Sequence, residues 1–138
     1  TDFIEKNLKD HNLGDRLIIE ILESNEIKEY TSINEYIEYL RKYNVRFAID
    51  DFGSGYSNLN HILNLNVDYV KIDGSLIKDI LENEKSLILV ESIIYFAKKL
   101  NLTTIAEFVS SEEIFDKLVS LGVDEFQGFY LSEPQINP

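Results

Sequence analysis

The sequence of 138 residues contains no cysteine and no methionine, and it has only two prolines and six glycines. The absence of cysteine excludes a disulfide framework and a thiolate metal site, and it makes a cytoplasmic location the expectation. No apolar run approaches the roughly 20 residues that a membrane-spanning helix requires, and no signal peptide or linker stands out. The chain starts without methionine, in what reads as the tail of an amphipathic helix, so we expect it to be cut from a longer protein.

Positive charge is also scarce, because 13 lysines and arginines face 25 aspartates and glutamates, for a net charge of -12. DNA and anionic membranes attract basic surfaces, so this charge argues against both as partners. An anionic substrate would instead need bound cations. The hydrophobic fraction of 44% and the aromatic fraction of 12% argue against disorder, and the length suits one domain with its own core.

Apolar runs alternate with helical patterns along the chain, which indicates repeated strand–helix units. The clearest helix is expected to follow Ser32, which forms a capping box with Glu35. A second helix carries apolar residues at helical spacing between Leu87 and Leu100, and a third begins near Ser110. The expected strands are Arg16–Ile21, Val45–Ile49, Asp68–Ile72, Leu102–Ala106 and Glu125–Leu131.

Polar side chains stand at the end of every expected strand. The carboxyl ends of parallel strands meet at one edge of a sheet, where carboxylates with one lysine and one amide favour a metal site. Asp50 and Asp51 are the most informative pair, because adjacent carboxylates repel and a divalent cation keeps both ionised. The alternative is that they merely begin a solvated turn. The residues at these strand ends are Glu20, Asp50, Asp51, Lys71, Asp73, Glu107 and Gln127.

Two architectures fit five strand–helix units. The length favours an open doubly wound sheet, since a (β/α)8 barrel typically needs about 250 residues. The receiver domain of two-component signalling is such an open sheet and also groups adjacent acids and a lysine around Mg²⁺. It places the acidic pair after the first strand and the lysine after the last. Here the pair follows the second expected strand and Lys71 the third, which argues against a receiver domain.

Five short motifs occur in order between about Leu17 and Pro134. They are EILES at 20–24, DDFGSGYS at 50–57, VDYVKID at 67–73, IAE at 105–107 and QGFY at 127–130. Together they resemble the C-terminal half of an EAL-type cyclic-di-GMP phosphodiesterase domain. The resemblance implies an α/β fold that is the C-terminal part of a TIM-like (β/α)8 barrel, truncated to about strands four to eight. It also implies cyclic di-GMP as the partner and two-metal hydrolysis to linear pGpG in the intact parent.

The resemblance assigns the metal ligands and the catalytic residues. Glu20 and Asp50 would bind one divalent cation, and Asp50 would bridge to a second. Asp51 and Glu107 would complete or support that second site. Lys71 and Glu107 would be the catalytic residues, with Lys71 orienting or helping to deprotonate the attacking water.

It also assigns supporting roles around these ligands. Gln127 would hold water or ligand, and Glu23 would brace a loop in which Gly53 and Gly55 allow a tight approach to metal and substrate. Hard oxygen ligands suit Mg²⁺ or Mn²⁺, two per intact site. Neither histidine stands at a strand end, so zinc is disfavoured, and we interpret both as ordinary surface or helix residues.

The chain lacks the Glu-Ala-Leu motif that names the family and the early strand that carries it. The similar run Glu38–Leu40 lies inside an expected helix and cannot replace it. Residues 1–138 are therefore expected to be a partial EAL domain with little activity alone. Half a barrel exposes a strand edge and an apolar face, so we expect it to pair with another copy or with further N-terminal parts of the parent.

Three residues depart from the family pattern within the matched region. Phe108 and Ser110 stand where the family usually has glycine and glutamate, and Gly74 stands where many members have a basic residue. We interpret Ser110 as the N-cap of the third helix, paired with Glu113, and Gly74 as a turn glycine. The lost carboxylate leaves an alternative function open, a catalytically degenerate module that binds cyclic di-GMP or a protein partner without hydrolysis.

Overall fold

The computed structural model describes residues 17–22, 29–53 and 59–128. Five parallel strands form one sheet whose spatial order is β1-β2-β3-β4-β5, the same as their order in the sequence. A doubly wound sheet reverses its strand order at a switch point, whereas a (β/α) barrel adds each strand beside the previous one. The unbroken order therefore favours part of a barrel over the open sheet. The strands are β1 (Ile18–Leu22), β2 (Arg46–Phe52), β3 (Tyr69–Ile72), β4 (Thr103–Ala106) and β5 (Glu125–Phe126).

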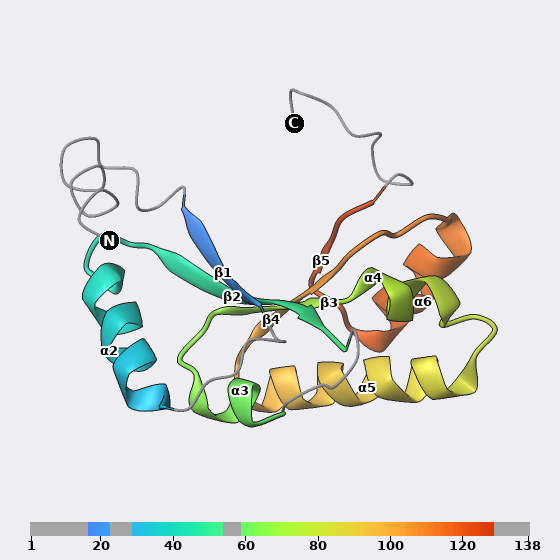
Figure 1. Cartoon of the computed structure of the whole chain (residues 1–138). Coiled ribbons are helices and arrows are strands. Elements are labelled where there is room, and N and C mark those ends of the chain that lie inside the picture. Colours follow the sequence, from blue (N-terminus) through green and yellow to red (C-terminus); the bar gives the residue numbers. More distant parts are fainter. Residues whose placement is uncertain (1–16, 23–28, 54–58, 129–138) are drawn as a thin grey trace.

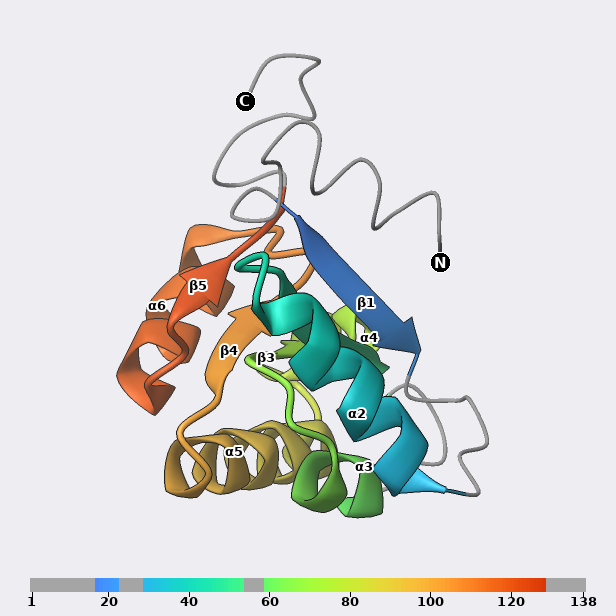
Figure 2. The ribbon, with the colours of Figure 1, turned by 90° about the vertical axis from the view of Figure 1, so that its left-hand side faces the viewer.

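Four of the described helices lie on one side of this sheet, and the short α4 follows the end of β3. In Figure 1, β1 and β5 diverge like the sides of a V, and α2, α3, α5 and α6 lie outside it; Figure 2 shows the same arrangement from the side. No helix of the described ranges is both long enough and apolar enough to cross a membrane. The helices are α2 (Tyr30–Arg41), α3 (Leu59–Asn64), α4 (Gly74–Asp79), α5 (Glu84–Lys99) and α6 (Glu112–Leu121).

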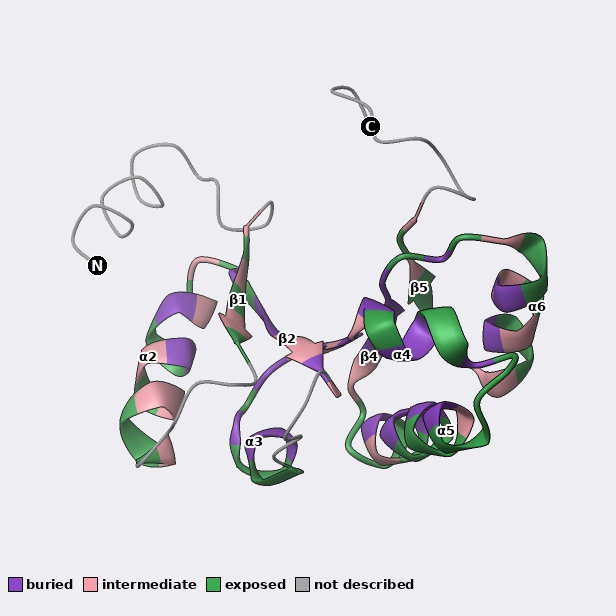
Figure 3. Ribbon diagram, turned by 45° about the vertical axis from the view of Figure 1, so that its right-hand side comes forward, coloured by how far each residue is buried: buried purple, intermediate pink, exposed green. Residues whose placement is uncertain are grey.

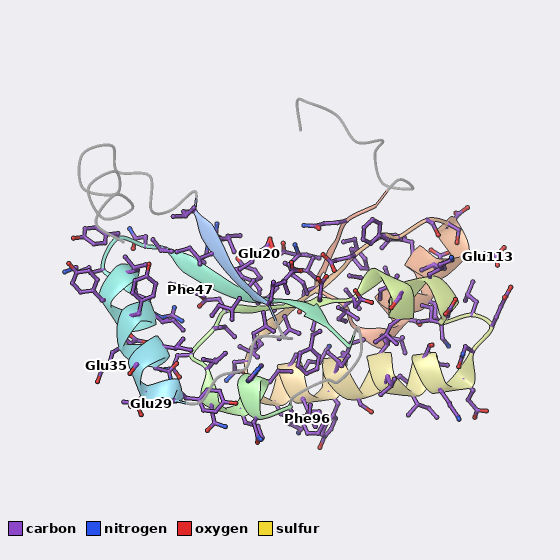
Figure 4. The ribbon with its side chains drawn as sticks, viewed as in Figure 1. Glu20, Glu29, Glu35, Phe47, Phe96 and Glu113 are labelled. Carbon is purple, nitrogen blue, oxygen red and sulfur yellow. The ribbon has the colours of Figure 1, made fainter. Side chains whose placement is uncertain are left out.

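The hydrophobic core fills the space between the sheet and its helices. Alternate residues of a strand point to opposite faces, and those of β2 that face the helices, Phe47 and Ile49, are fully buried. Figure 3 shows the buried parts of α2, α5 and α6 on their inner sides. In Figure 4, Phe47 points toward α2 while Glu20 stands on the opposite face of the sheet, inside the V. That opposite face carries the polar residues of the strand ends.

Several expected boundaries shift in the structure. β2 extends to Phe52, so Asp50 and Asp51 belong to the strand and do not begin a turn after it. The helix expected after Ser32 begins earlier, at Tyr30, and no side chain caps it, so the predicted capping box with Glu35 is wrong. Tyr30 explains the earlier start, because its hydroxyl pairs with Nδ1 of His61 at 2.8 Å and so packs the first turn of α2 against α3.

Of three single-residue interpretations, one is confirmed and two change. His61 lies in a helix, as one of the two expected placements, and it is buried there; His11 lies outside the described residues. The N-cap of α6 is Ser111, whose hydroxyl accepts a hydrogen bond from the Ile114 N–H, so Ser110 is not the cap. Gly74 is the first residue of α4 and not part of a turn. The run Glu38–Leu40 lies within α2, as expected.

Candidate functional site

Five charged side chains from four strand ends meet on the concave face of the sheet. The ammonium of Lys71, on β3, lies 3.1 Å from a carboxylate oxygen of Glu20 on β1. It also lies 3.7 Å from Oδ1 of Asp50 on β2 and 3.4 Å from Oε1 of Glu107, which directly follows β4. Asp51 joins the group through its carboxylate. The parallel ladder places these ends side by side, as predicted from the strand pattern.

A β-bulge aims two consecutive acids at the same point. Ile49 of β2 pairs with Val70 of β3, and Phe52 pairs with Ile72. Between these two pairs, β2 therefore contains one residue more than β3. Asp51 takes up the extra residue with a left-handed backbone, φ 54°, and its N–H donates to Oδ1 of Asp50 at 2.9 Å. In a regular strand these neighbours would point to opposite faces. The bulge instead keeps both carboxylates at the site.

Glu107 is the most perturbed acid of the site. Only 12% of its side chain is exposed, and within the described parts of the chain no donor pairs with its Oε2. Burial, reinforced by the charge of Asp50, raises the pKa of Glu107 to about 7, although the Lys71 ammonium acts in the opposite direction. In the metal-free protein, this carboxyl group is therefore partly protonated near neutral pH.

The pKa values of Asp51 and Lys71 are also shifted by burial and by the neighbouring charges. Burial and the charges of Asp50 and Asp73 raise the pKa of Asp51. For Lys71, burial alone would lower the pKa, but the hydrogen bond to Glu20 and the charges of Asp50 and Glu107 outweigh it and raise the pKa. Lys71 therefore stays an ammonium throughout the physiological range. Asp73 acts electrostatically here while its carboxylate caps α4 by accepting from the Ser75 N–H.

The remaining predicted site residues lie at varied distances from this cluster. Gln127 follows β5 at the same edge, and its N–H continues the ladder to the Ala106 carbonyl, but within the described residues its side chain makes no hydrogen bond to the cluster. Gly53 follows β2 with φ 96°, and a Cβ there would lie 2.3 Å from Leu76, so the position requires glycine. Glu23 and Gly55 lie outside the described residues.

The donor set fits a divalent cation. Asp50, Asp51 and Glu107 each offer a carboxylate oxygen, and the three oxygens lie within 4.8 Å of one another. Three carboxylates so close together repel one another unless a positive charge balances them, and Oε2 of Glu107, which has no hydrogen-bond partner among the described residues, has a lone pair to offer. All the donors are hard oxygens, which suits Mg²⁺ or Mn²⁺ better than a thiolate-seeking metal.

Comparison with known proteins gives the same picture. The EAL domain model matches residues 1–134. The cyclic di-GMP phosphodiesterase PdeA of Borreliella burgdorferi is 39% identical over 119 residues, which is 86% of this chain but 18% of that protein. A solved structure titled PaMucR phosphodiesterase, c-di-GMP complex, matches with a TM-score of 0.86 at 31% identity, and covers 97% of this chain and 55% of that one.

A third relative was solved with a metal. The manganese and cyclic-di-GMP complex of Klebsiella pneumoniae BlrP1 matches with a TM-score of 0.81 at 30% identity, over 93% of this chain and 34% of that one. The chain thus spans less than two thirds of each of these relatives. The family model nevertheless covers nearly the whole sequence, and the predicted resemblance is confirmed. This chain belongs to the EAL domain family.

Proposed function

We propose that this chain supplies the greater part of the active site of a cyclic-di-GMP phosphodiesterase, which hydrolyses its substrate to linear pGpG with two divalent cations. The observation that carries the proposal is the convergence of the Asp50, Asp51 and Glu107 oxygens around the Lys71 ammonium. The relatives described above are a cyclic-di-GMP phosphodiesterase and two complexes with cyclic di-GMP, which supports the same substrate.

The acids would hold the cations. Glu20 and Asp50 are proposed to bind one, and Asp50, Asp51 and Glu107 the other. Bound Mg²⁺ or Mn²⁺ would neutralise the phosphodiester, lower the pKa of an attacking water and stabilise the leaving oxygen. Asp50 is suited to a shared position because its carboxylate lies close to those of Asp51 and Glu107 and 3.7 Å from the Lys71 ammonium, which also contacts Glu20.

Lys71 is proposed to act as a hydrogen-bond donor and not as a base. Its raised pKa keeps the proton on Nζ, so it can orient a water or contact a phosphate oxygen, and its charge favours hydroxide over neutral water. Glu107 is proposed to contribute to catalysis through the cation that it would help to hold, with its carboxylate also lying 3.4 Å from the Lys71 ammonium. Gln127 would position water or ligand from the end of β5, and Glu23 and Gly55 would support the loop after Gly53.

Residues 1–138 are proposed to be the part of the domain that holds strands four to eight of the barrel. The unbroken strand order supports this, and so does the coverage of about half of the PaMucR chain. β1 has no partner on its outer side among the described residues, and Ile18 and Leu22 are exposed on it. The rest of the domain, or another copy of the chain, would cover that edge and the concave face. This piece alone is expected to show little activity.

The test is hydrolysis of cyclic di-GMP by the full-length protein with Mn²⁺, followed by separation of the linear product. Asp50→Asn and Glu107→Gln should each lower turnover by at least a hundredfold, while Glu91→Gln, an exposed carboxylate on α5, serves as the matched control. Binding of cyclic di-GMP without turnover would instead identify the degenerate module. If the protein neither binds nor hydrolyses cyclic di-GMP, the proposal is wrong.

A further inference from the structure

Phe108 follows β4 at the edge of the sheet where the carboxylates meet. It directly follows Glu107, and 62% of the residue is exposed, more than for any other large apolar residue that the structure describes. Its backbone has φ 57°, in the left-handed region that residues with large side chains avoid. Exposure of a hydrophobic ring and a left-handed backbone are both unfavourable for stability. Their occurrence together, directly after Glu107, indicates that the ring has a function.

The backbone on both sides holds Phe108 in this conformation. Glu107 is largely buried before it and Val109 is fully buried after it. The Val109 N–H donates to the Gln127 carbonyl at 2.8 Å, which ties the segment to the end of β5. The ring is therefore carried by a fixed segment and not by a loose loop.

Gly74 makes room for the ring at the start of α4. A Cβ at Gly74 would lie 2.1 Å from Cδ2 of Phe108 and 2.9 Å from its Cγ. Gly74 is a helical residue without a left-handed φ, so its backbone does not require glycine. The space that the Phe108 ring occupies is the reason for a glycine here. The two departures from the family pattern, at positions 74 and 108, are thus physically linked.

We propose that Phe108 is a ligand-positioning residue that stacks on a purine base of the nucleotide substrate, with Gly74 setting the place of the ring. The inference rests on the proposed function, since the base belongs to the cyclic dinucleotide. The acidic cluster can hold phosphate only through cations, which leaves the bases to be held by other contacts. An exposed phenyl ring offers a flat apolar surface of the kind on which bases stack.

The experiment compares four variants of the full-length protein. Phe108→Asn removes the ring but suits a left-handed backbone, and Phe108→Tyr keeps the ring. Gly74→Ala pushes the ring from its place without touching the acidic cluster, and the double variant Gly74→Ala, Phe108→Asn tests the link. Tyr95→Leu is the matched control, an equally exposed aromatic on the outer side of α5.

KM and kcat for cyclic di-GMP are measured with Mn²⁺, or Kd if the protein binds without turnover. Phe108→Asn should raise KM roughly five- to a hundredfold, the effect of removing a base-stacking ring, with kcat within about threefold of the parent. Phe108→Tyr and Tyr95→Leu should match the parent. Gly74→Ala should raise KM in the parent and have no further effect in the Phe108→Asn background.

Distinct outcomes separate this inference from the proposed function. A parent protein that neither binds nor hydrolyses cyclic di-GMP overturns both. An active parent whose KM is unchanged by Phe108→Asn overturns the stacking inference alone. The stacking inference is also overturned if Phe108→Asn weakens binding and at the same time lowers the unfolding midpoint by more than about 5 °C. That combination would indicate a structural role for Phe108.

Discussion

Asp50 and Asp51 are consecutive residues of one strand, yet both present a carboxylate oxygen to the same cluster. The left-handed backbone of Asp51 and the register shift between β2 and β3 make this geometry possible. This arrangement has a conformational free-energy cost, because residues other than glycine, asparagine and aspartate rarely adopt a left-handed backbone. It also brings together two like charges that need a counter-charge.

The backbone cost can be measured by comparing two substitutions that remove the same charge. Asp51→Asn retains a side chain that tolerates a left-handed φ, whereas Asp51→Ala does not. We expect Asp51→Ala to have a free energy of unfolding about 1 kcal/mol lower than Asp51→Asn in urea titrations with a chelator present. Equal stabilities would mean that position 51 is not held in the left-handed region.

Glu107 should make the stability of the metal-free protein depend on pH. Its folded pKa of about 7 lies above the ordinary value of 4.5, so the folded state holds a proton that the unfolded state releases between these values. The stability contributed by this group is full below about pH 4.5 and is lost as the pH rises through 7. In chelator-treated samples, Glu107→Gln should gain about 2–3 kcal/mol relative to the parent from pH 4.5 to 8.

Chemical denaturation at several pH values checks this expectation. Glu91→Gln, an exposed carboxylate in the middle of α5, should show the same pH profile as the parent. A profile of Glu107→Gln that runs parallel to that of the parent would place the Glu107 pKa near its ordinary value.

Metal binding should release protons near neutral pH. A ligand must bind in its deprotonated form, and the Glu107 carboxyl is about half protonated at pH 7. Calorimetric titration of the full-length protein with Mn²⁺, in buffers of different ionisation enthalpy, should report about half a proton released per site at pH 7. The release should approach zero at pH 9. Release that is independent of pH would exclude Glu107 as a ligand.

Lys71 should matter both for the fold and for turnover. It is only 12% exposed and contacts three carboxylates, so Lys71→Met leaves those charges unbalanced. Without metal, we expect the free energy of unfolding to fall by about 1–3 kcal/mol. With Mn²⁺, kcat should fall by at least a hundredfold, since the donor to water is lost. Lys85→Met, exposed on α5, is the control, and a kcat within tenfold of the parent would remove Lys71 from the mechanism.

The grouping of charged residues at the strand ends could be predicted from the sequence alone. Strand–helix alternation predicts parallel strands, and parallel strands bring their carboxyl ends to one edge, so Glu20, Asp50, Lys71 and Glu107 were expected together and do lie together. Five of the predicted site residues form the cluster. The distance between the Gln127 side chain and that cluster depends on the side-chain conformation and could not be predicted.

Boundaries and burial were predicted less well, and for a common reason. Ser32 with Glu35 satisfies a local capping rule, but the contact of Tyr30 with His61, 31 residues away, starts α2 earlier. Likewise, nothing in the neighbourhood of His61 in the sequence indicates that α2 covers it. Local rules cannot include contacts between segments that are distant in the chain.

The amino-acid sequence by itself determined the succession of strands and helices, the acidic character of the strand ends and the family, because periodicity and motif spacing are properties of neighbouring residues. Only the tertiary structure decided that a bulge turns Asp51 to the side of Asp50, that burial raises the Glu107 pKa and that Phe108 fills the space above Gly74. Each of these depends on the distance between atoms of different strands or helices, and folding alone sets such distances.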